Sequence, residues 1–419
     1  MKRFILLVFT LFILSGCGTE FSAPDMELRA DEHFEYDSRI YYAESFSLFR
    51  HVRLVSGRFE PIEGTYIGAY IQSDRIVAGD IMAFEQFVGR EHSFYTYFLN
   101  MGQPFPSEWV LNCIAHMKTP NIVLLPGNIE QPFDEHLLRE TARSFGEINV
   151  PMFVHFFPVS HSAAFTADEY AAFFRMAREY FNRYASNIAL VWAIDAESLH
   201  LMERFYPGDD YVDWVGINIF IDSQMSFYEV RLKLDTFYFH FQSRKPIFIS
   251  QLGISHFTTR NHAYHVAEAI RMMELIFEAI IKDYPRIKAV NYMSFNGLDP
   301  VRQRRGIYNF SITDNGHMTR AYAAVIDDAH FLGRVDFNVG GALISQRISH
   351  PKAILYYRGD FFIRAHMDIG QNIGINAPNA GAIVRVGAHE YYPLALAVDG
   401  MGAIRADFEN RMIEIVALR

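Results

Sequence analysis

Four acidic residues that follow predicted strands are the first candidates for chemistry. Asp195 and Glu197 come after the apolar run 188–193, Asp222 follows the run 212–220, and Asp299 follows the run 287–295. Two carboxyl groups can divide catalytic work, because one donates a proton while the other accepts a proton or attacks a carbon atom. Acidic residues also cap helices or pair with arginines, and the segment 302–305 is rich in arginine. Asp195 and Glu197 are therefore candidate catalytic carboxylates with a structural alternative.

Aromatic and amide side chains lie within or near the ends of the same predicted strands. Flat aromatic faces and neutral hydrogen-bonding amides suit the binding of sugar rings, although each aromatic could equally belong to the core. The candidate ligand-binding residues are His155, Phe156, Trp192, Asn218, Phe220, Gln251, Tyr292 and Phe295. The histidine spacings match no known pattern of metal ligands, so neither a metal nor another cofactor is predicted.

A repeating pattern of strands and helices must position these residues. The clearest helix begins at the capping-box sequence Thr166-Ala-Asp-Glu169 and continues to Tyr184. The strands are short apolar runs, as expected for strands that are buried on both faces. They are predicted at 65–71, 93–99, 121–125, 152–157, 188–193, 212–220, 246–250 and 287–295. Eight such units predict an α/β fold, a (β/α)8 TIM barrel over residues 62–330.

The pattern changes after Phe331. Short alternating runs such as 382–386 and 412–416 predict a small β-rich domain over residues 338–419. Within it, residues 359–370 align with residues 389–400, which indicates a repeat of 30 residues. This region resembles the copper amine oxidase-like stalk domain of secreted bacterial proteins.

Several segments of the predicted barrel together resemble a known family. They are Gly68-Ala-Tyr70, Val191-Trp192, the run Tyr206–Phe220 and Lys245-Pro-Ile247. In this order and spacing they resemble glycoside hydrolase family 26, the β-mannanase family of (β/α)8 barrels, over about residues 62–330. The resemblance implies one glutamate at the end of strand four as general acid/base and another at the end of strand seven as nucleophile.

The matching positions in this chain are Val159 and Gln251. Valine has neither a proton to donate nor a lone pair, and glutamine is neutral and a very poor nucleophile. Retaining hydrolysis needs two carboxyl groups about 5–5.5 Å apart. In addition, Phe220 stands where the family often has a tyrosine that supports the nucleophile. The resemblance therefore implies a pseudoenzyme that binds a β-linked polysaccharide or wall glycan.

Two other functions stay open at this point. One is an active, β-mannanase-like endo-acting hydrolase that uses relocated carboxylates, Asp195 or Glu197. The other is a structural scaffold in which the barrel carries no ligand. A fold alone does not decide between these functions.

The first 17 residues predict export. Lys2 and Arg3 precede an apolar run, 4–14, that is too short to span a bilayer. Leu14-Ser-Gly-Cys17 resembles the lipobox of bacterial lipoproteins, which implies a lipid on Cys17 and tethering to the membrane at the bacterial cell surface. Residues 18–61 are predicted to be a tether followed by a segment that packs against the barrel. Cys113 then has no disulfide partner.

Composition excludes some partners. The formal net charge is −10, and no basic stripe is present, which excludes nucleic acid as a partner. Hydrophobic residues make up 50% of the chain, enough for a large core in each predicted domain. The identity of the glycan and the oligomeric state are left open by the sequence.

Overall fold

The computed structural model describes residues 57–337, apart from 129, 161–164, 223–224, 259–261 and 299–307, together with short strands on either side of that range. The chain divides into two compact units. One consists of residues 53–344, and the other combines residues 1–52 with residues 345–419.

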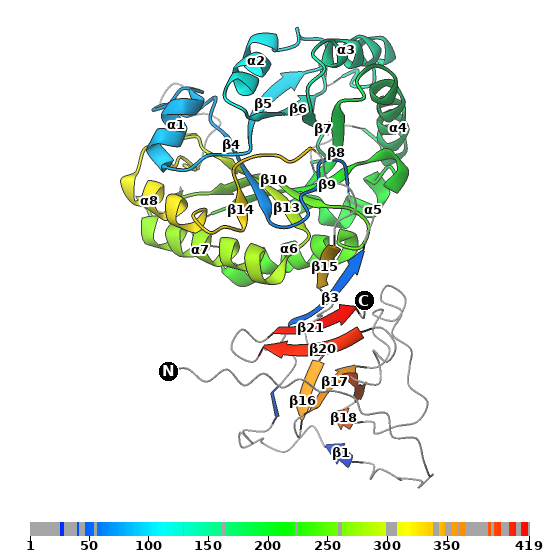
Figure 1. Ribbon diagram of the computed structural model, residues 1–419. Coiled ribbons are helices and arrows are strands. Elements are labelled where there is room, and N and C mark those ends of the chain that lie inside the picture. The colour runs from blue at the N-terminus through cyan, green and yellow to red at the C-terminus, as the bar shows by residue number, and fades with distance from the viewer. Residues whose placement is uncertain are drawn as a thin grey trace. The chain divides into compact units, whose positions relative to one another are not determined.

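Eight parallel strands of the first unit form a closed barrel (Figure 1). They are β4 (Thr65–Tyr70), β5 (Phe94–Asn100), β6 (Thr119–Leu125), β7 (Met152–Phe156), β8 (Ile188–Asp195), β9 (Trp214–Ile221), β10 (Ile247–Ile254) and β13 (Ile287–Met293). Each strand pairs with the next, and β13 pairs with β4 to close the barrel, with Asn291 opposite Gly68. The predicted (β/α)8 TIM barrel is confirmed.

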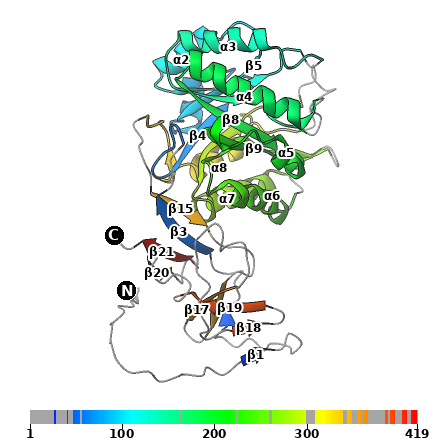
Figure 2. The same ribbon diagram turned by 90° about the vertical axis from the view of Figure 1, so that its right-hand side faces the viewer.

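Helices surround the strands in both views of the ribbon (Figures 1 and 2). They are α1 (Ile81–Val88), α2 (Ser107–Ala115), α3 (Glu135–Glu147), α4 (Ala167–Tyr184), α5 (Met202–Phe205), α6 (Phe227–Phe241), α7 (Val266–Asp283) and α8 (Gly316–Val325). The short 3-10 helices η2 (Ala196–Leu201) and η3 (Asp209–Tyr211) lie between β8 and β9. The predicted capping box is present at the start of α4, where Thr166 and Glu169 satisfy each other's backbone amides.

Smaller strands complete this unit. The pair β11 (Phe257–Thr258) and β12 (Ala263–Tyr264) is antiparallel and follows β10. Strand β14 (Phe331–Leu332) lies parallel to the start of β4.

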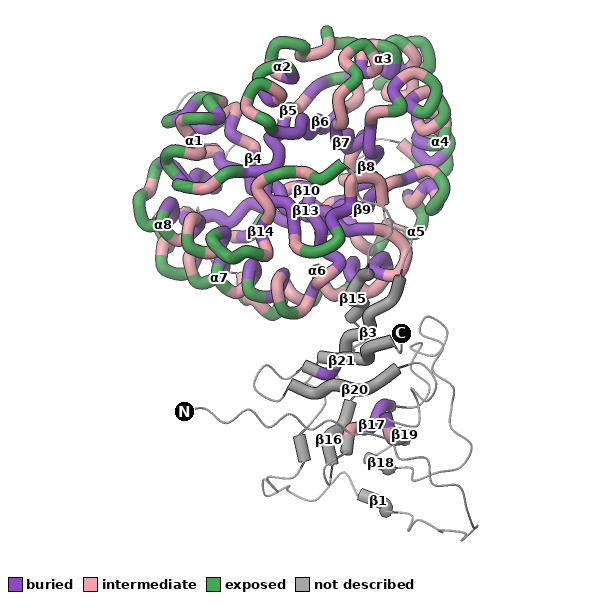
Figure 3. The backbone as a smooth tube through the Cα atoms, viewed as in Figure 1, coloured by how far each residue is buried: buried purple, intermediate pink, exposed green. Residues whose placement is uncertain are grey.

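Successive side chains of each barrel strand point alternately into the barrel and out toward the helices. The inward side chains near the amino-terminal ends of the strands form a mainly aromatic cluster: Tyr66, Phe94, Phe153, Val191, Trp214 and Phe248, with Ala189 and Ala289. The outward side chains join the larger core beneath the helices. Figure 3 shows the strands as buried along most of their length.

A buried ion pair lies at the amino-terminal end of the barrel. Arg286 Nε lies 2.8 Å from Glu60 Oε1, and both side chains are fully buried. The second carboxylate oxygen of Glu60 accepts the backbone N–H of Gly57 at 2.7 Å. Nearby, the ring of Phe59 packs edge-on against Phe153. This pair therefore fixes the segment that covers the aromatic cluster.

The second unit is β-rich, as predicted. One sheet contains β1 (Met26–Leu28), β18 (Val384–Val386), β19 (His389–Pro393), β17 (Asp360–Arg364), β16 (Ile354–Tyr357) and β2 (Ile40–Tyr41). The other contains β15 (Leu343–Arg347), β3 (Ser47–Arg53), β21 (Met412–Ala417) and β20 (Gly402–Asp407). Strands β17 and β19 lie at the start of the two segments of the predicted repeat, 359–370 and 389–400, and they are antiparallel neighbours.

The amino-terminal segment differs from its prediction. Its strands β1, β2 and β3 pair with β18, β16 and β21, which all come from the far end of the chain. We expected residues 18–61 to be a tether that then packs against the barrel, and the end of this segment does pack there, through Phe59 and Glu60. Pairing across more than 300 residues leaves no local pattern in the sequence, which is why the prediction missed it. Cys17 and the lipobox lie outside the described residues.

Two further observations concern membrane-spanning helices and the buried cysteine. Within the described part of the chain, no helix is long and apolar enough to cross a bilayer. Cys113 is buried in α2, and burial raises the pKa of its thiol to about 12, which favours an inert side chain.

The ion pair gives a stability prediction. Replacing one partner leaves a buried charge without compensation, which typically costs about 3–5 kcal/mol. We expect Glu60→Ala to lower the free energy of unfolding by that amount in urea denaturation, whereas Glu63→Ala, at an exposed position, changes it by less than about 0.5 kcal/mol. The double variant Glu60→Leu with Arg286→Met should recover more than half of the loss. Equal stability of Glu60→Ala and Glu63→Ala would contradict this role.

Candidate functional site

Three polar side chains lie in a row across the carboxyl-terminal ends of adjacent strands. Asp195 on β8 is paired in register with Asn218 on β9, and Asn218 is paired with Gln251 on β10. On β8 the outward residues Trp192 and Ile194 belong to the core beneath the helices, which places Asp195 on the inward side. The carboxyl-terminal end of the strands is where barrel enzymes hold their active sites. We call Asp195, Asn218 and Gln251 the polar row.

Hydrogen bonding orders this row. Asn218 Nδ2 donates to Asp195 Oδ1 at 2.8 Å. Asn218 is only 4% exposed, and its Oδ1 has no hydrogen-bond partner among the described residues. An acceptor buried in this way costs about 1–3 kcal/mol unless a donor reaches it. The row is therefore suited to a ligand that supplies hydrogen-bond donors.

Val159 lies at the same end of the barrel, but its side chain does not face the interior. It is fully buried in the core beneath the helices and is paired with the outward-facing Ile194. Its N–H donates to Ala193 O at 2.8 Å, and its own carbonyl accepts the N–H of Asp195 at 2.9 Å. The position that the resemblance matches to the acid/base therefore contributes its side chain to the core.

The backbone of Phe157 explains this orientation. Its φ of +46° lies in the left-handed region, which is rare for a bulky residue. Phe156 and Phe157 both belong to the outer core, and their rings stack with centroids 4.3 Å apart. The strict alternation of β7 is thus interrupted by one residue, and Val159 turns outward.

Three predicted ligand-binding aromatics belong to the core. Phe156, Trp192 and Tyr292 are at most 1% exposed and lie on the outward side of their strands. Trp192, for example, packs against Tyr206 and Phe241. The prediction that these three line a groove is wrong, because outward positions of a barrel strand face the helices.

Other aromatic side chains do gather at the carboxyl-terminal end. Phe220 follows Asn218 by two residues on the inward side of β9 and is 39% exposed. It packs against Phe310, which also contacts the predicted Phe295 and Tyr308. We call Phe220, Phe295, Tyr308 and Phe310 the aromatic group.

Sequence reasoning missed part of this end of the barrel. Tyr308 and Phe310 were missed because they come from a segment beyond the last predicted strand. Tyr70 packs edge-on against Phe98 and lies 6.2 Å from Phe295, centroid to centroid. Tyr70 and Phe98 had a usable signal, since both lie at inward positions near the ends of predicted strands.

The second candidate carboxylate differs from Asp195. Glu197 lies on η2, is largely exposed, and pairs with Lys233 of α6 at 2.5 Å. Asp222 follows β9 and accepts a long hydrogen bond, 3.5 Å, from Thr258. Burial raises the pKa of Tyr308, and the negative charges of Asp222 and Glu197 add to the rise.

His155 lies below the polar row, inside the barrel. It is fully buried, with its ring 4.8 Å from that of Phe248, and neither ring nitrogen has a hydrogen-bond partner among the described residues. Burial lowers its pKa to about 3, so the ring is neutral. The predicted role of His155 in direct ligand binding does not fit this complete burial.

Polar residues of other strands occupy the barrel interior as well. Thr96 donates to Asn291 Oδ1 at 2.8 Å, and Asn121 donates to Thr96 at 2.9 Å. Asn291 in turn donates to the carbonyl of Ser250 at 2.9 Å. These bonds cross the barrel and support the strands that carry the polar row.

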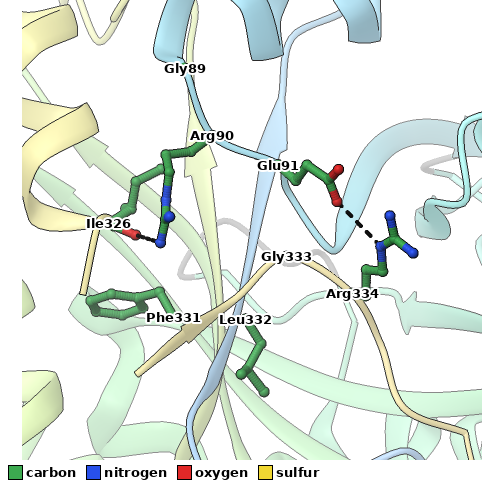
Figure 4. A pocket seen from close by; sticks show the side chains of 8 residues that line it. All are labelled: Gly89, Arg90, Glu91, Ile326, Phe331, Leu332, Gly333 and Arg334. Atoms are coloured by element: carbon green, nitrogen blue, oxygen red, sulfur yellow. Dashed lines mark hydrogen bonds and ion pairs between the residues drawn. The ribbon is translucent and has the colours of Figure 1, made fainter. Parts of the chain in front are cut away.

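A pocket of about 560 Å³ lies at the opposite, amino-terminal end of the strands (Figure 4). Its charged groups are already paired: Arg334 with Glu91 at 3.2 Å, and Arg90 with Asp327 at 3.2 Å. In barrel enzymes the active site lies at the carboxyl-terminal end of the strands, and residues at the amino-terminal end contribute to stability. We therefore place the candidate site at the carboxyl-terminal end. Among the described side chains, no group of three or more histidine, cysteine or acidic residues is arranged to hold a metal ion.

Part of the chain is similar in sequence to a known family. Residues 156–239, from the end of β7 into α6, match the sequence model of "Glycosyl hydrolase family 26". This part of the chain is similar to that family. It contains Asp195 and Asn218 but ends before Gln251. No curated protein matches the chain in sequence.

Solved structures similar to the chain include two proteins of the same family. The GH26 β-mannanase BoMan26A from Bacteroides ovatus is 12% identical, with 66% of this chain and 92% of that chain covered and a TM-score of 0.48. GH26C from a Muricauda species is 15% identical, with coverages of 66% and 91% and a TM-score of 0.49. An endo-1,4-β-xylanase from Caldicellulosiruptor owensensis is 11% identical, with coverages of 64% and 99% and a TM-score of 0.44.

The buried neutral histidine predicts acid sensitivity. The pKa of His155 is about 3 in the folded chain and about 6.5 when unfolded, so the unfolded state binds the extra proton between these values. This contribution to stability is complete above pH 6.5 and falls by up to ~1.4 kcal/mol per pH unit as the pH drops toward 3. His155→Phe should flatten the fall in unfolding free energy between pH 7 and 4.5, while His136→Gln, on the exposed face of α3, should not. Parallel pH profiles for wild type and His155→Phe would refute this.

The orientation of Val159 gives a second prediction. Val159→Glu would place a carboxylate in the apolar core beneath the helices, so we expect it to lower the unfolding free energy by about 3–5 kcal/mol. Gln251→Glu, at a half-buried inward position, should be tolerated. The two changes together should therefore release no reducing sugar from mannan. A stable double variant that hydrolyses mannan would show that residue 159 does reach the site.

Proposed function

We propose that the barrel binds a β-linked polysaccharide or cell-wall glycan at its carboxyl-terminal end without cleaving it. The supporting observation concerns the last inward-facing residue of each described barrel strand. These residues are Tyr70, Asn100, Leu125, His155, Asp195, Phe220, Gly253 and Met293. Asp195 is the one carboxylate among them.

One carboxylate does not suffice for either common mechanism of glycoside hydrolysis. Retaining enzymes hold two carboxyl groups about 5–5.5 Å apart, and inverting enzymes hold them about 6.5–9.5 Å apart. Position 251 supplies an amide, and Val159 is directed into the core. Glu197 is exposed and forms an ion pair with Lys233 of α6. Binding without turnover is therefore the function that these residues support best.

The export signal in the sequence supports a location for this binding. Leu14-Ser-Gly-Cys17 favours a lipid on Cys17, and we propose a protein anchored to the membrane at the bacterial cell surface. An anchored protein that held a glycan without cutting it would connect the membrane to that glycan.

The proposal predicts binding without hydrolysis. The full chain should bind at least one β-linked polysaccharide in affinity gels that contain mannan, mixed β-glucan or purified wall glycan. The same preparation should release no reducing ends from these polymers over a day. Asp195→Ala is assayed alongside it. Turnover that this substitution abolishes would overturn the proposal in favour of a hydrolase with relocated carboxylates, and absence of binding to every polymer would favour a scaffold.

A matched pair of variants locates the binding. Phe220→Ala removes an exposed ring beside the polar row, whereas Phe87→Ala removes an equally exposed ring on α1. Loss of a stacking ring is expected to weaken binding by about 1–1.5 kcal/mol, roughly tenfold. We expect this loss for Phe220→Ala alone. Equal retardation of both variants in the gel would place the site elsewhere.

A further inference from the structure

Two members of the polar row, Asp195 and Asn218, offer acceptors to a ligand, while the amide of Gln251 beside them can both donate and accept. The side-chain nitrogen of Asn218 donates a hydrogen bond to Asp195. The side-chain oxygen of Asn218, Oδ1, is a buried acceptor that has no partner among the described residues. The carboxylate of Asp195 adds acceptor oxygens and a negative charge beside it. A ligand group that fits this pair must donate hydrogen bonds, and a positive charge on that group would be favoured.

Another negative side chain lies at this end of the barrel. Asp222 follows β9 directly, at the same end of the barrel as the polar row. The charge of Glu197, in contrast, is compensated by Lys233 at 2.5 Å. The chain as a whole has a formal net charge of −10. Negative side chains around a partly buried site favour a cationic ligand.

The aromatic group adds a second recognition element. Phe220 is exposed two residues beyond Asn218, on the same inward side of β9. It packs between Phe310 and the backbone of Gly253, where even a Cβ atom would lie 2.8 Å from the ring. A ring held in this position can stack on a sugar and can also attract a nearby ammonium through its face.

From these observations we infer that the polar row binds an amine-bearing sugar, a β-linked hexosamine whose amino group is free and protonated. The ammonium donates to Asp195 and to Asn218 Oδ1, and the sugar ring lies against Phe220. A neutral hydroxyl can also donate, but it gains no charge interaction with Asp195. An acetylated amine keeps one N–H and loses the positive charge. This inference rests on the proposed glycan binding and narrows its ligand class.

The test compares three β-1,4-linked tetrasaccharides that differ only at carbon 2: glucose units with a hydroxyl, N-acetylglucosamine units and glucosamine units. Binding to the full chain is measured by calorimetry at pH 5.5, where the amine is protonated and an ordinary aspartate is ionised. We expect the glucosamine oligomer to bind at least tenfold more tightly than either neutral oligomer. The difference should shrink when the salt is raised from 20 to 300 mM, because salt screens a partly exposed charge pair.

Matched variants assign the effect to the polar row. Asp195→Asn keeps the shape of the side chain and removes its charge, so it should abolish the preference while retaining weak binding. Glu203→Gln removes an exposed carboxylate of α5 and should leave the preference unchanged. Both variants are checked for an unchanged unfolding midpoint, so that a loss of folding is not read as a loss of binding.

Other results would overturn the inference. Equal or tighter binding of a neutral oligomer would refute the amine and leave the proposed glycan binding intact. Tighter binding of a carboxylate-bearing oligosaccharide would refute it and direct attention to the arginine-rich segment 302–305, which lies outside the described residues. Absence of binding to every oligomer and polymer would refute the proposed function as well.

Discussion

The hydrogen-bond register of the closed barrel decides which side chains can act at its carboxyl-terminal end. Each strand directs every second residue inward, and a shift of one residue exchanges the two sets. On β8 this rule sends Val191 and Asp195 inward and Trp192 outward. Asn218 lies opposite Asp195, and an irregularity in the β9–β10 pairing at Ser250 brings Gln251 opposite Asn218, so the three residues form one row. The candidate site is a consequence of this alignment more than of any single residue.

The interruption at Phe157 makes the end of β7 different from its neighbours. A left-handed backbone at a bulky residue costs of order 1–3 kcal/mol, which the stacked rings of Phe156 and Phe157 and their contacts with Phe173 help to offset. Tyr170 stabilises the same turn by donating to the carbonyl of Phe157 at 3.0 Å. The result is that Val159 completes the apolar layer between β8 and α4. At position 159 both the residue type and the direction of the side chain are therefore those of a core residue.

The sequence predicted the barrel well and the site only in part. Every barrel strand was found because buried parallel strands are short apolar runs, and the capping box marked the start of α4. Trp192 could also have been assigned to the core. It lies three residues before Asp195 on the same strand, so its side chain points to the opposite side of the sheet. Val159 could not, because the left-handed turn at Phe157 leaves no local signal. The pairing of β1, β2 and β3 with carboxyl-terminal strands was missed for a related reason, since contacts between distant segments have no periodicity to detect.

The polar row is best understood through the free energy that it costs. Small residues, Ala193 and Gly216, lie directly beneath Asp195 and Asn218, and an apolar residue at position 218 would leave no buried acceptor there. Asn218 instead holds an oxygen that no described residue satisfies, beside a carboxylate that its own amide orients. A buried polar group of this kind lowers stability by about 1–3 kcal/mol in the absence of a donor. A ligand that donates hydrogen bonds to both side chains recovers that free energy on binding, so the buried acceptor that lowers the stability of the barrel would raise its affinity for such a ligand.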